Sequence, residues 1–157
     1  MRGGYLKVIG NVGDRVGCPL PGEQRGLGGG FVYIQGHAGN ELGHRMRRGT
    51  IAVSGDCGDY AGYEMLAGTI VVAGKAGVHA GLAMRRGTII LGGNRPEDLR
   101  AGFQHACTFR PPMMPLLAKQ LEKDASPRMA AAARHVRFDL FHGDTAQMGR
   151  GEILLPA

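Results

Sequence analysis

Two pairs of adjacent arginines, Arg47-Arg48 and Arg85-Arg86, stand out because each pair precedes the same Gly-Thr-Ile sequence. If the chain coils regularly, the pairs occupy one position two turns apart, roughly 9 to 10 Å along the axis at one inter-strand spacing per turn. Arg2 falls in the same column. A spaced column of guanidinium groups matches a polyanionic ligand, such as a string of carboxylates, through charge-assisted bidentate hydrogen bonds. The alternative is a solubilising face whose arginines pair with acidic residues of the C-terminal tail.

The other reactive side chains do not form a recognised catalytic pattern. The sequence contains no Ser-His-Asp arrangement, paired-carboxylate motif, phosphate-binding loop or metal-ligand spacing. His37 and His44 lie close together but have no Cys or third His near them in the sequence, so we predict no metal site there. Asp56, Asp59 and Glu64 are expected to be solvated turn residues. We therefore predict that the isolated chain has no catalytic residue and no metal.

Composition limits the compartment and the partners. The three widely spaced cysteines, Cys18, Cys57 and Cys107, indicate neither a disulfide framework nor an iron–sulfur or zinc site, and they suit a reducing compartment. Because the chain has no run of about 18 apolar residues and no apolar N-terminal signal, we expect a cytoplasmic protein without membrane association. The net charge of +6 favours an acidic partner or ligand, but the absence of Trp leaves few stacking surfaces for nucleic acid.

A 19-residue repeat must position the arginines. The segment Met46-Arg47-Arg48-Gly49-Thr50-Ile51 recurs as Met65-Leu66-Ala67-Gly68-Thr69-Ile70 and as Met84-Arg85-Arg86-Gly87-Thr88-Ile89. The pattern extends back to Met1, with seven extra residues in the segment from Cys18 to Gly26. Apolar residues alternate as in a short strand, and the Gly residues around them indicate turns.

One such unit, with two short strands and Gly corners, cannot bury a hydrophobic face alone, whereas stacked units can. The sequence therefore predicts an all-β solenoid over residues 1–93, a single-stranded right-handed parallel β-helix of about 19-residue coils. Cys57 is expected to pack inside as a small apolar residue. The expected inward columns include Met46, Met65 and Met84; Ile51, Ile70 and Ile89; and Val53, Val72 and Leu91.

Residues 94–157 are predicted to form an α/β C-terminal capping tail. A helix is expected over 115–123, and a second helix should open at the N-cap Ser126 and run to about residue 135. Strands are expected over 136–141 and 151–155. Because the ends of a solenoid need caps, the tail is expected to fold over its flank or end.

The repeat resembles the GXGXG family, which includes the C-terminal domain of the large chain of glutamate synthase and the GXGXG subunit of formylmethanofuran dehydrogenase. The resemblance rests on units such as the segment 46–58 and covers residues 1–93. Two further features resemble the dehydrogenase member in particular: the last Arg-Arg-Gly-Thr-Ile unit followed by a tail with Phe109 and an apolar helix, and the ending Gly143-Asp144-x-x-x-x-Gly149-Arg150-Gly151-Glu152-Ile153. Arg150 stands where the family more usually has Lys.

This resemblance implies a non-catalytic structural subunit of a formyl-transferring complex of one-carbon metabolism. The complex is either formylmethanofuran dehydrogenase or the bacterial formyltransferase/hydrolase complex, which moves formyl between a methanofuran-like cofactor and tetrahydromethanopterin and releases formate. The implied partners are amidohydrolase-like, formyltransferase-like and cofactor-binding subunits in a hetero-oligomer. Because such cofactors have polyglutamate tails, Arg47, Arg48, Arg85 and Arg86 are candidates for a track that binds one.

Two alternatives remain open on the sequence. One is a linker module of the glutamate synthase type, which the Gly-Asp and Gly-Arg-Gly-Glu-Ile elements of the tail disfavour. The other is a self-assembling repeat protein without a ligand. The dehydrogenase member of the family usually has further coils before the region seen here, so we expect the first strand to have an exposed edge that needs a partner chain.

Overall fold

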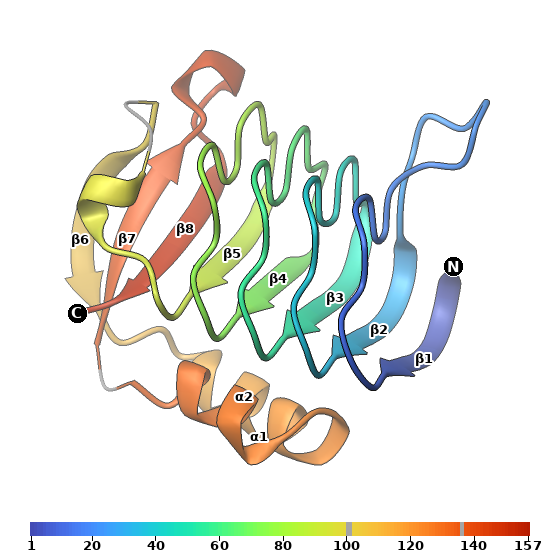
Figure 1. Ribbon diagram of the computed structural model, residues 1–157. Coiled ribbons are helices and arrows are strands. Elements are labelled where there is room, and N and C mark those ends of the chain that lie inside the picture. The colour runs from blue at the N-terminus through green and yellow to red at the C-terminus, as the bar shows by residue number, and fades with distance from the viewer. Residues whose placement is uncertain (100–101, 136) are drawn as a thin grey trace.

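Five parallel strands, one from each repeat, form the N-terminal part of the protein (Figure 1). The structure is a computed structural model that describes residues 1–99, 102–135 and 137–157. The strands are β1 (Arg2–Val8), β2 (Gly28–Ile34), β3 (Arg48–Val53), β4 (Thr69–Val72) and β5 (Gly87–Leu91). The extra segment before β2 projects from the first turn as a loop (Figure 1).

The repeats stack in register. Thr50 pairs with Thr69 and Thr69 with Thr88, and the isoleucines that follow pair in the same way. The Met and Ile columns expected to point inward are fully buried in repeats three to five, with Met65 and Ile70 both at 0% exposure. Gly68, at φ 113°, immediately precedes β4, and a residue with a side chain would be strained in this backbone conformation.

Both faces of the central strands are buried. Ile51, Val53 and their counterparts pack against the return loops, whereas Ala52, Val71 and Ile90 point to the opposite face. Helices α1 (Met114–Asp124) and α2 (Pro127–Ala133) cover that opposite face, as Figure 1 shows. Ser126 caps α2 by accepting a hydrogen bond from the backbone N–H of Met129, as the sequence predicts.

The C-terminal tail extends the same sheet. Strands β6 (Gln104–Phe109), β7 (Phe138–Gly143) and β8 (Gly151–Pro156) join it in the order β1-β2-β3-β4-β5-β8-β7-β6. β8 runs parallel to β5, whereas the pairs β8–β7 and β7–β6 are antiparallel. The 3-10 turns η1 (Pro96–Asp98) and η2 (Thr145–Gln147) lie in the connections. The strand expected over 136–141 is β7, and Val136 lies outside the described residues.

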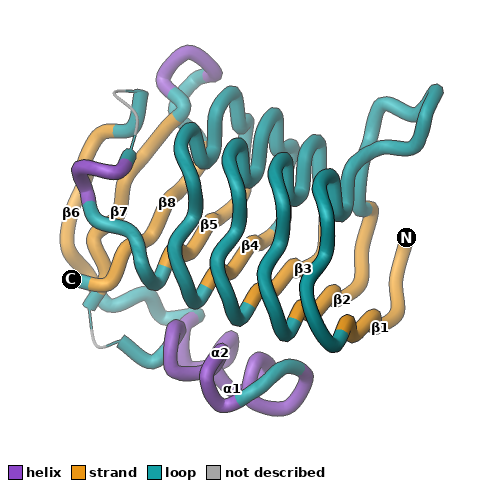
Figure 2. The backbone as a smooth tube through the Cα atoms, viewed as in Figure 1, coloured by secondary structure: helices purple, strands orange, loops and turns teal. Residues whose placement is uncertain are grey.

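The prediction of an all-β solenoid, a single-stranded right-handed parallel β-helix, was wrong. Across the described residues the protein has one eight-stranded mixed sheet, partly antiparallel, together with two α-helices. The first reason is that each repeat has one strand instead of two, because its return half forms turns (Figure 2). The second is that the tail continues the sheet through β8, which runs parallel to β5, and then through the antiparallel strands β7 and β6. The division into segments 1–93 and 94–157 stays a prediction.

Side-chain acceptors supplement the backbone hydrogen bonds that join the return halves of neighbouring repeats. In one column, a backbone N–H of each repeat donates to a side chain of the preceding repeat. His37 donates to Asn11 Oδ1, Asp56 donates to His37 Nδ1, and Lys75 donates to Asp56 Oδ1. In a second column, Asp14, Asn40 and Asp59 each accept a hydrogen bond from the backbone of the next repeat. The described return halves also form two isolated β-bridges, Ala38 with Cys57 and Cys57 with Ala76, and further backbone hydrogen bonds, such as Gly62 N–H to Leu42 O at 2.7 Å. Side-chain acceptors therefore satisfy backbone donors that a strand would otherwise pair.

Candidate functional site

The arginine pairs lie at the corner where each return loop meets its strand. Arg48 is the first residue of β3, and Arg85 and Arg86 immediately precede β5; all three are exposed. The backbone holds this corner in place, because the N–H groups of Arg47 and Arg48 both donate to Leu27 O, at 2.9 and 3.2 Å. The N–H of Arg85 likewise donates to Met65 O at 2.8 Å. The Met before each arginine pair is buried in the core, and the two arginine side chains that follow it are exposed to solvent.

Three adjoining hollows run along this corner. The first, of about 640 Å³, lies between β1 and β3 and includes Arg47 and Arg48. The second, of about 460 Å³, shares Gln24 and Arg25 with the first and includes Arg85. The third shares Arg85 and Gln147 with the second. We call this continuous surface the arginine groove. Its cationic members are Arg2, Arg25, Arg45, Arg47, Arg48, Arg85, Arg86 and Arg150.

The groove is strongly cationic. The acidic residues in its lining are Glu23 and Glu64. Glu64 accepts a hydrogen bond from Arg45 at 2.5 Å, and this bond is the main reason why the pKa of the Glu64 carboxyl is lowered. Among the described residues, the other seven arginines of the groove form no ion pair.

The structure brings the predicted residues into one groove but not into one unbroken column. Leu66 and Ala67 occupy the arginine positions of the intervening repeat. Arg25, from the projecting loop, and Arg45, one residue before a core Met, line the hollow beside that gap. Sequence reasoning missed these two because neither lies in the repeated position, and their approach depends on the path of the projecting loop.

Sequence reasoning also missed Arg150, although a signal was present. Arg150-Gly151-Glu152-Ile153 repeats the spacing of Arg86-Gly87-Thr88-Ile89, and Gly87 pairs with Gly151 in the sheet. Strand β8 thus adds one more rung beyond β5, and Arg150 continues the column of Arg86. The six rungs from β1 to β8 span five inter-strand spacings, or about 24 Å.

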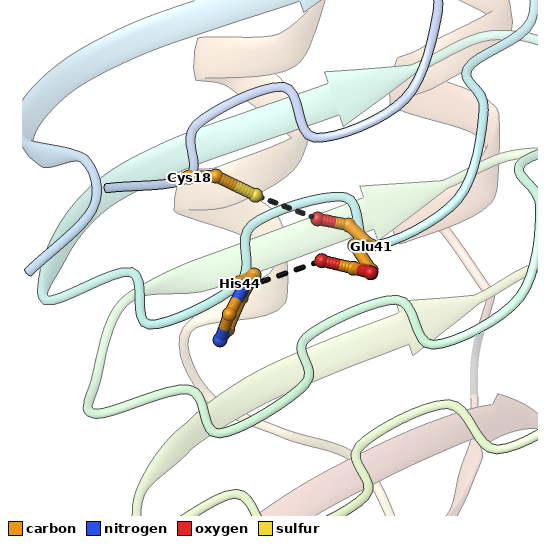
Figure 3. A group of neighbouring side chains, drawn as sticks. All are labelled: Cys18, Glu41 and His44. Atoms are coloured by element: carbon orange, nitrogen blue, oxygen red, sulfur yellow. Dashed lines mark hydrogen bonds and ion pairs between the residues drawn. The ribbon is translucent and has the colours of Figure 1, made fainter. Parts of the chain in front are cut away.

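A second cluster joins Cys18, Glu41 and His44 at the base of the projecting loop (Figure 3). The Cys18 thiol donates a hydrogen bond to the carbonyl oxygen of Glu41 at 3.2 Å. His44 Nδ1 lies 3.4 Å from Glu41 Oε2. The sequence did not reveal this cluster because Cys18 is distant from His44 in the chain, whereas stacking places the two side by side from adjacent turns.

Among the described residues, no helix is long and apolar enough to cross a membrane. No family model matches the chain, so the GXGXG assignment stays a prediction. No curated protein matches it either.

A solved structure resembles nearly the whole chain. It is a chain in the crystal structure of the formyltransferase/hydrolase complex (FhcABCD) from Methylorubrum extorquens in complex with methylofuran. The two chains are 37% identical and superpose with a TM-score of 0.88 over 99% of the present chain. The present chain spans 57% of the length of that chain. The protein is therefore similar in sequence and fold to a component of a formyltransferase/hydrolase complex.

Proposed function

We propose that this protein is a non-catalytic structural subunit of a cytoplasmic formyl-transferring complex of the formyltransferase/hydrolase type. The observation that carries the proposal is the similarity to a chain of such a complex over 99% of the present chain at 37% identity. That similarity includes the tail, residues 94–157, whereas the resemblance to glutamate synthase rests on the repeats alone. The partners in this proposal are amidohydrolase-like, formyltransferase-like and cofactor-binding subunits.

The chemistry of the groove supports a binding role. An arginine guanidinium stays protonated at all physiological pH values, so it donates hydrogen bonds and positive charge but does not transfer protons. Seven of the eight groove arginines have no ion-pair partner among the described residues, so their donors are available to an anion. A surface of this kind binds and orients an anionic chain while another protein of the assembly performs the reaction.

We further propose that the arginine groove binds the polyglutamate tail of a methanofuran-like cofactor. The rungs that carry Arg2 and Arg150 lie about 24 Å apart, which an extended chain of roughly seven residues spans at about 3.4 Å per residue. Carboxylates along such a tail meet guanidinium groups at several rungs, in the charge-assisted geometry that arginine favours. Arg47, Arg48, Arg85 and Arg86 are the central contacts of this proposed track.

Affinity purification of the tagged full chain from its native cells tests the subunit assignment. The expected result is stoichiometric recovery of an amidohydrolase-like and a formyltransferase-like chain, identified by mass. Iron–sulfur and metal-pterin subunits in the same fraction would indicate the dehydrogenase type instead. Recovery of the chain alone, or with amidotransferase chains, would contradict the assignment. An untagged strain processed in parallel controls for proteins that bind the resin.

A further inference from the structure

We propose that Cys18, Glu41 and His44 form a binding site for a thiophilic divalent cation, with Zn²⁺ as its preferred occupant. The three residues offer a thiol sulfur, a carboxylate oxygen and a ring nitrogen, and these ligand atoms all lie within 4.8 Å of one another. Figure 3 shows the three residues as neighbours, with interactions that join Cys18 to the backbone carbonyl of Glu41 and His44 to its carboxylate. This inference does not depend on the proposed function.

The distances suit a tetrahedral zinc ion after a small side-chain adjustment. Zinc binds sulfur at about 2.3 Å and nitrogen or oxygen at about 2.0 to 2.2 Å, so tetrahedral ligand atoms lie roughly 3.3 to 3.6 Å apart. His44 Nδ1 and Glu41 Oε2 are already 3.4 Å apart. The Cys18 sulfur lies within 4.8 Å of both atoms, and it has to leave its present acceptor, the Glu41 carbonyl, to become the third ligand.

The backbone fixes the ligands on two adjacent turns. Glu41 and His44 belong to one tight turn, in which His44 N–H donates to Glu41 O at 3.2 Å. Cys18 closes the equivalent turn of the preceding repeat by donating its N–H to Arg15 O at 3.1 Å. The N–H of Gly43 donates to Val16 O at 2.8 Å and joins the two turns. The backbone positions of the three ligands are therefore set before a cation arrives, so that binding has to reorder only side chains.

The surroundings of His44 resemble an outer coordination shell. While Nδ1 faces Glu41, the other nitrogen, Nε2, lies 3.9 Å from Glu64 Oε2. Glu64 is held by Arg45 at 2.5 Å. Metal-binding histidines usually donate a hydrogen bond from their second nitrogen to a carboxylate, which fixes the orientation of the ring, and Glu64 is the carboxylate placed to accept one as the ring adjusts. The His44 side chain is only 16% exposed, so few alternative orientations are open to it.

The mixed ligand set determines the class of cation. A thiolate and an imidazole favour Zn²⁺ over Mg²⁺ and Ca²⁺, which prefer oxygen ligands. Binding replaces the thiol proton of Cys18, which is released to solvent as the sulfur–metal bond forms. Three protein ligands leave one tetrahedral position for water. Arg15 donates to the same Glu41 oxygen at 3.1 Å, but its side chain is 66% exposed and free to move away.

The test uses the full chain, first stripped of metal with a chelator and then titrated with ZnCl₂ in competition with a chromophoric chelator. The expected result is one Zn²⁺ per chain and at least a hundredfold loss of affinity in Cys18→Ser and in His44→Ala. Cys107→Ser, which removes an exposed thiol, and His79→Ala, which removes an exposed imidazole, are matched controls that should bind as the parent protein does.

Co²⁺ provides a second readout that does not depend on affinity. Co²⁺ bound to the parent protein should give a thiolate-to-metal charge-transfer band, and Cys18→Ser should lose this band while its circular dichroism spectrum stays unchanged. The absence of stoichiometric zinc binding in the parent protein would overturn the proposal. Unchanged zinc affinity in a folded Cys18→Ser variant would also overturn it.

Discussion

Charge reversal at Arg47 and Arg85 is expected to weaken binding of a polyglutamate chain by about thirtyfold. The groove has eight arginines and two glutamates in its lining, and the double variant Arg47→Glu, Arg85→Glu changes this to six and four. Two attractive contacts are lost and two repulsive ones are introduced. At about 0.5 kcal/mol for each exposed contact the change is about 2 kcal/mol, which corresponds to about thirtyfold in Kd.

Fluorescence anisotropy with a labelled seven-glutamate peptide measures this change directly. The matched control is Arg128→Glu, Arg137→Glu, which alters the net charge equally at exposed arginines outside the groove. The parent protein and the control should bind alike, because the Debye length at 0.1 M salt is about 10 Å and screens distant charges. The difference between the groove variant and the parent protein should shrink as salt concentration rises.

Two results would refute this reasoning. If the groove variant binds the peptide as tightly as the parent protein, the groove is not the binding surface. If the control loses as much affinity as the groove variant, net charge alone governs binding and the spatial arrangement of the arginines is irrelevant. Neither result bears on the subunit assignment, which affinity purification of the chain tests separately.

Three further predictions concern the fold. Ile70→Ala should lower the free energy of unfolding by about 2 to 5 kcal/mol in denaturant titration because Ile70 is fully buried, whereas the exposed Val78→Ala should change it little. Burial raises the pKa of the Cys57 thiol to about 12, from 9.0, so its contribution to stability is present below pH 9 and is lost as pH rises towards 12. Cys57→Ala, which matches its neighbours Ala38 and Ala76, should therefore flatten the alkaline loss of stability. Asp59→Ala removes the acceptor of the Val78 N–H and should cost about 1 kcal/mol by the same titration, and no change would contradict the role given to these side-chain columns.

The register of the repeats was predictable because it follows from one repeated pattern. Met, Gly, Thr and Ile recur every 19 residues, and the structure pairs Thr50, Thr69 and Thr88 accordingly. The helix cap at Ser126 was also predictable, because its signal is local. Both predictions depended on interactions that a short stretch of sequence specifies.

The form of the return half and the direction of the tail strands were not predictable in the same way. Some hydrogen bonds of the return half go to side chains such as Asn40 and Asp59, and alternating apolar residues do not distinguish these turns from a second strand. Alternation also says nothing about strand direction, so the strand predicted over 136–141 came without the antiparallel direction of β7. Strand β6 was not predicted.

The candidate sites likewise include residues that the sequence pattern identifies and residues that only the folded structure brings together. Arg47, Arg48, Arg85 and Arg86 could be found because they share a position in the repeat. Arg25 required knowledge of how the projecting loop returns to the corner. The Cys18 cluster required knowledge of which side chains of adjacent turns meet, since Cys18 and Glu41 are 23 positions apart in the chain.

Native mass spectrometry of the affinity-purified protein tests the central claim most directly, because it weighs the assembly that the chain forms. We predict a discrete hetero-oligomer that contains this 16.6 kDa chain together with a formyltransferase-like chain and an amidohydrolase-like chain in fixed ratio. A mass that corresponds to the chain alone, or to copies of this chain only, would contradict the assignment to a formyl-transferring complex.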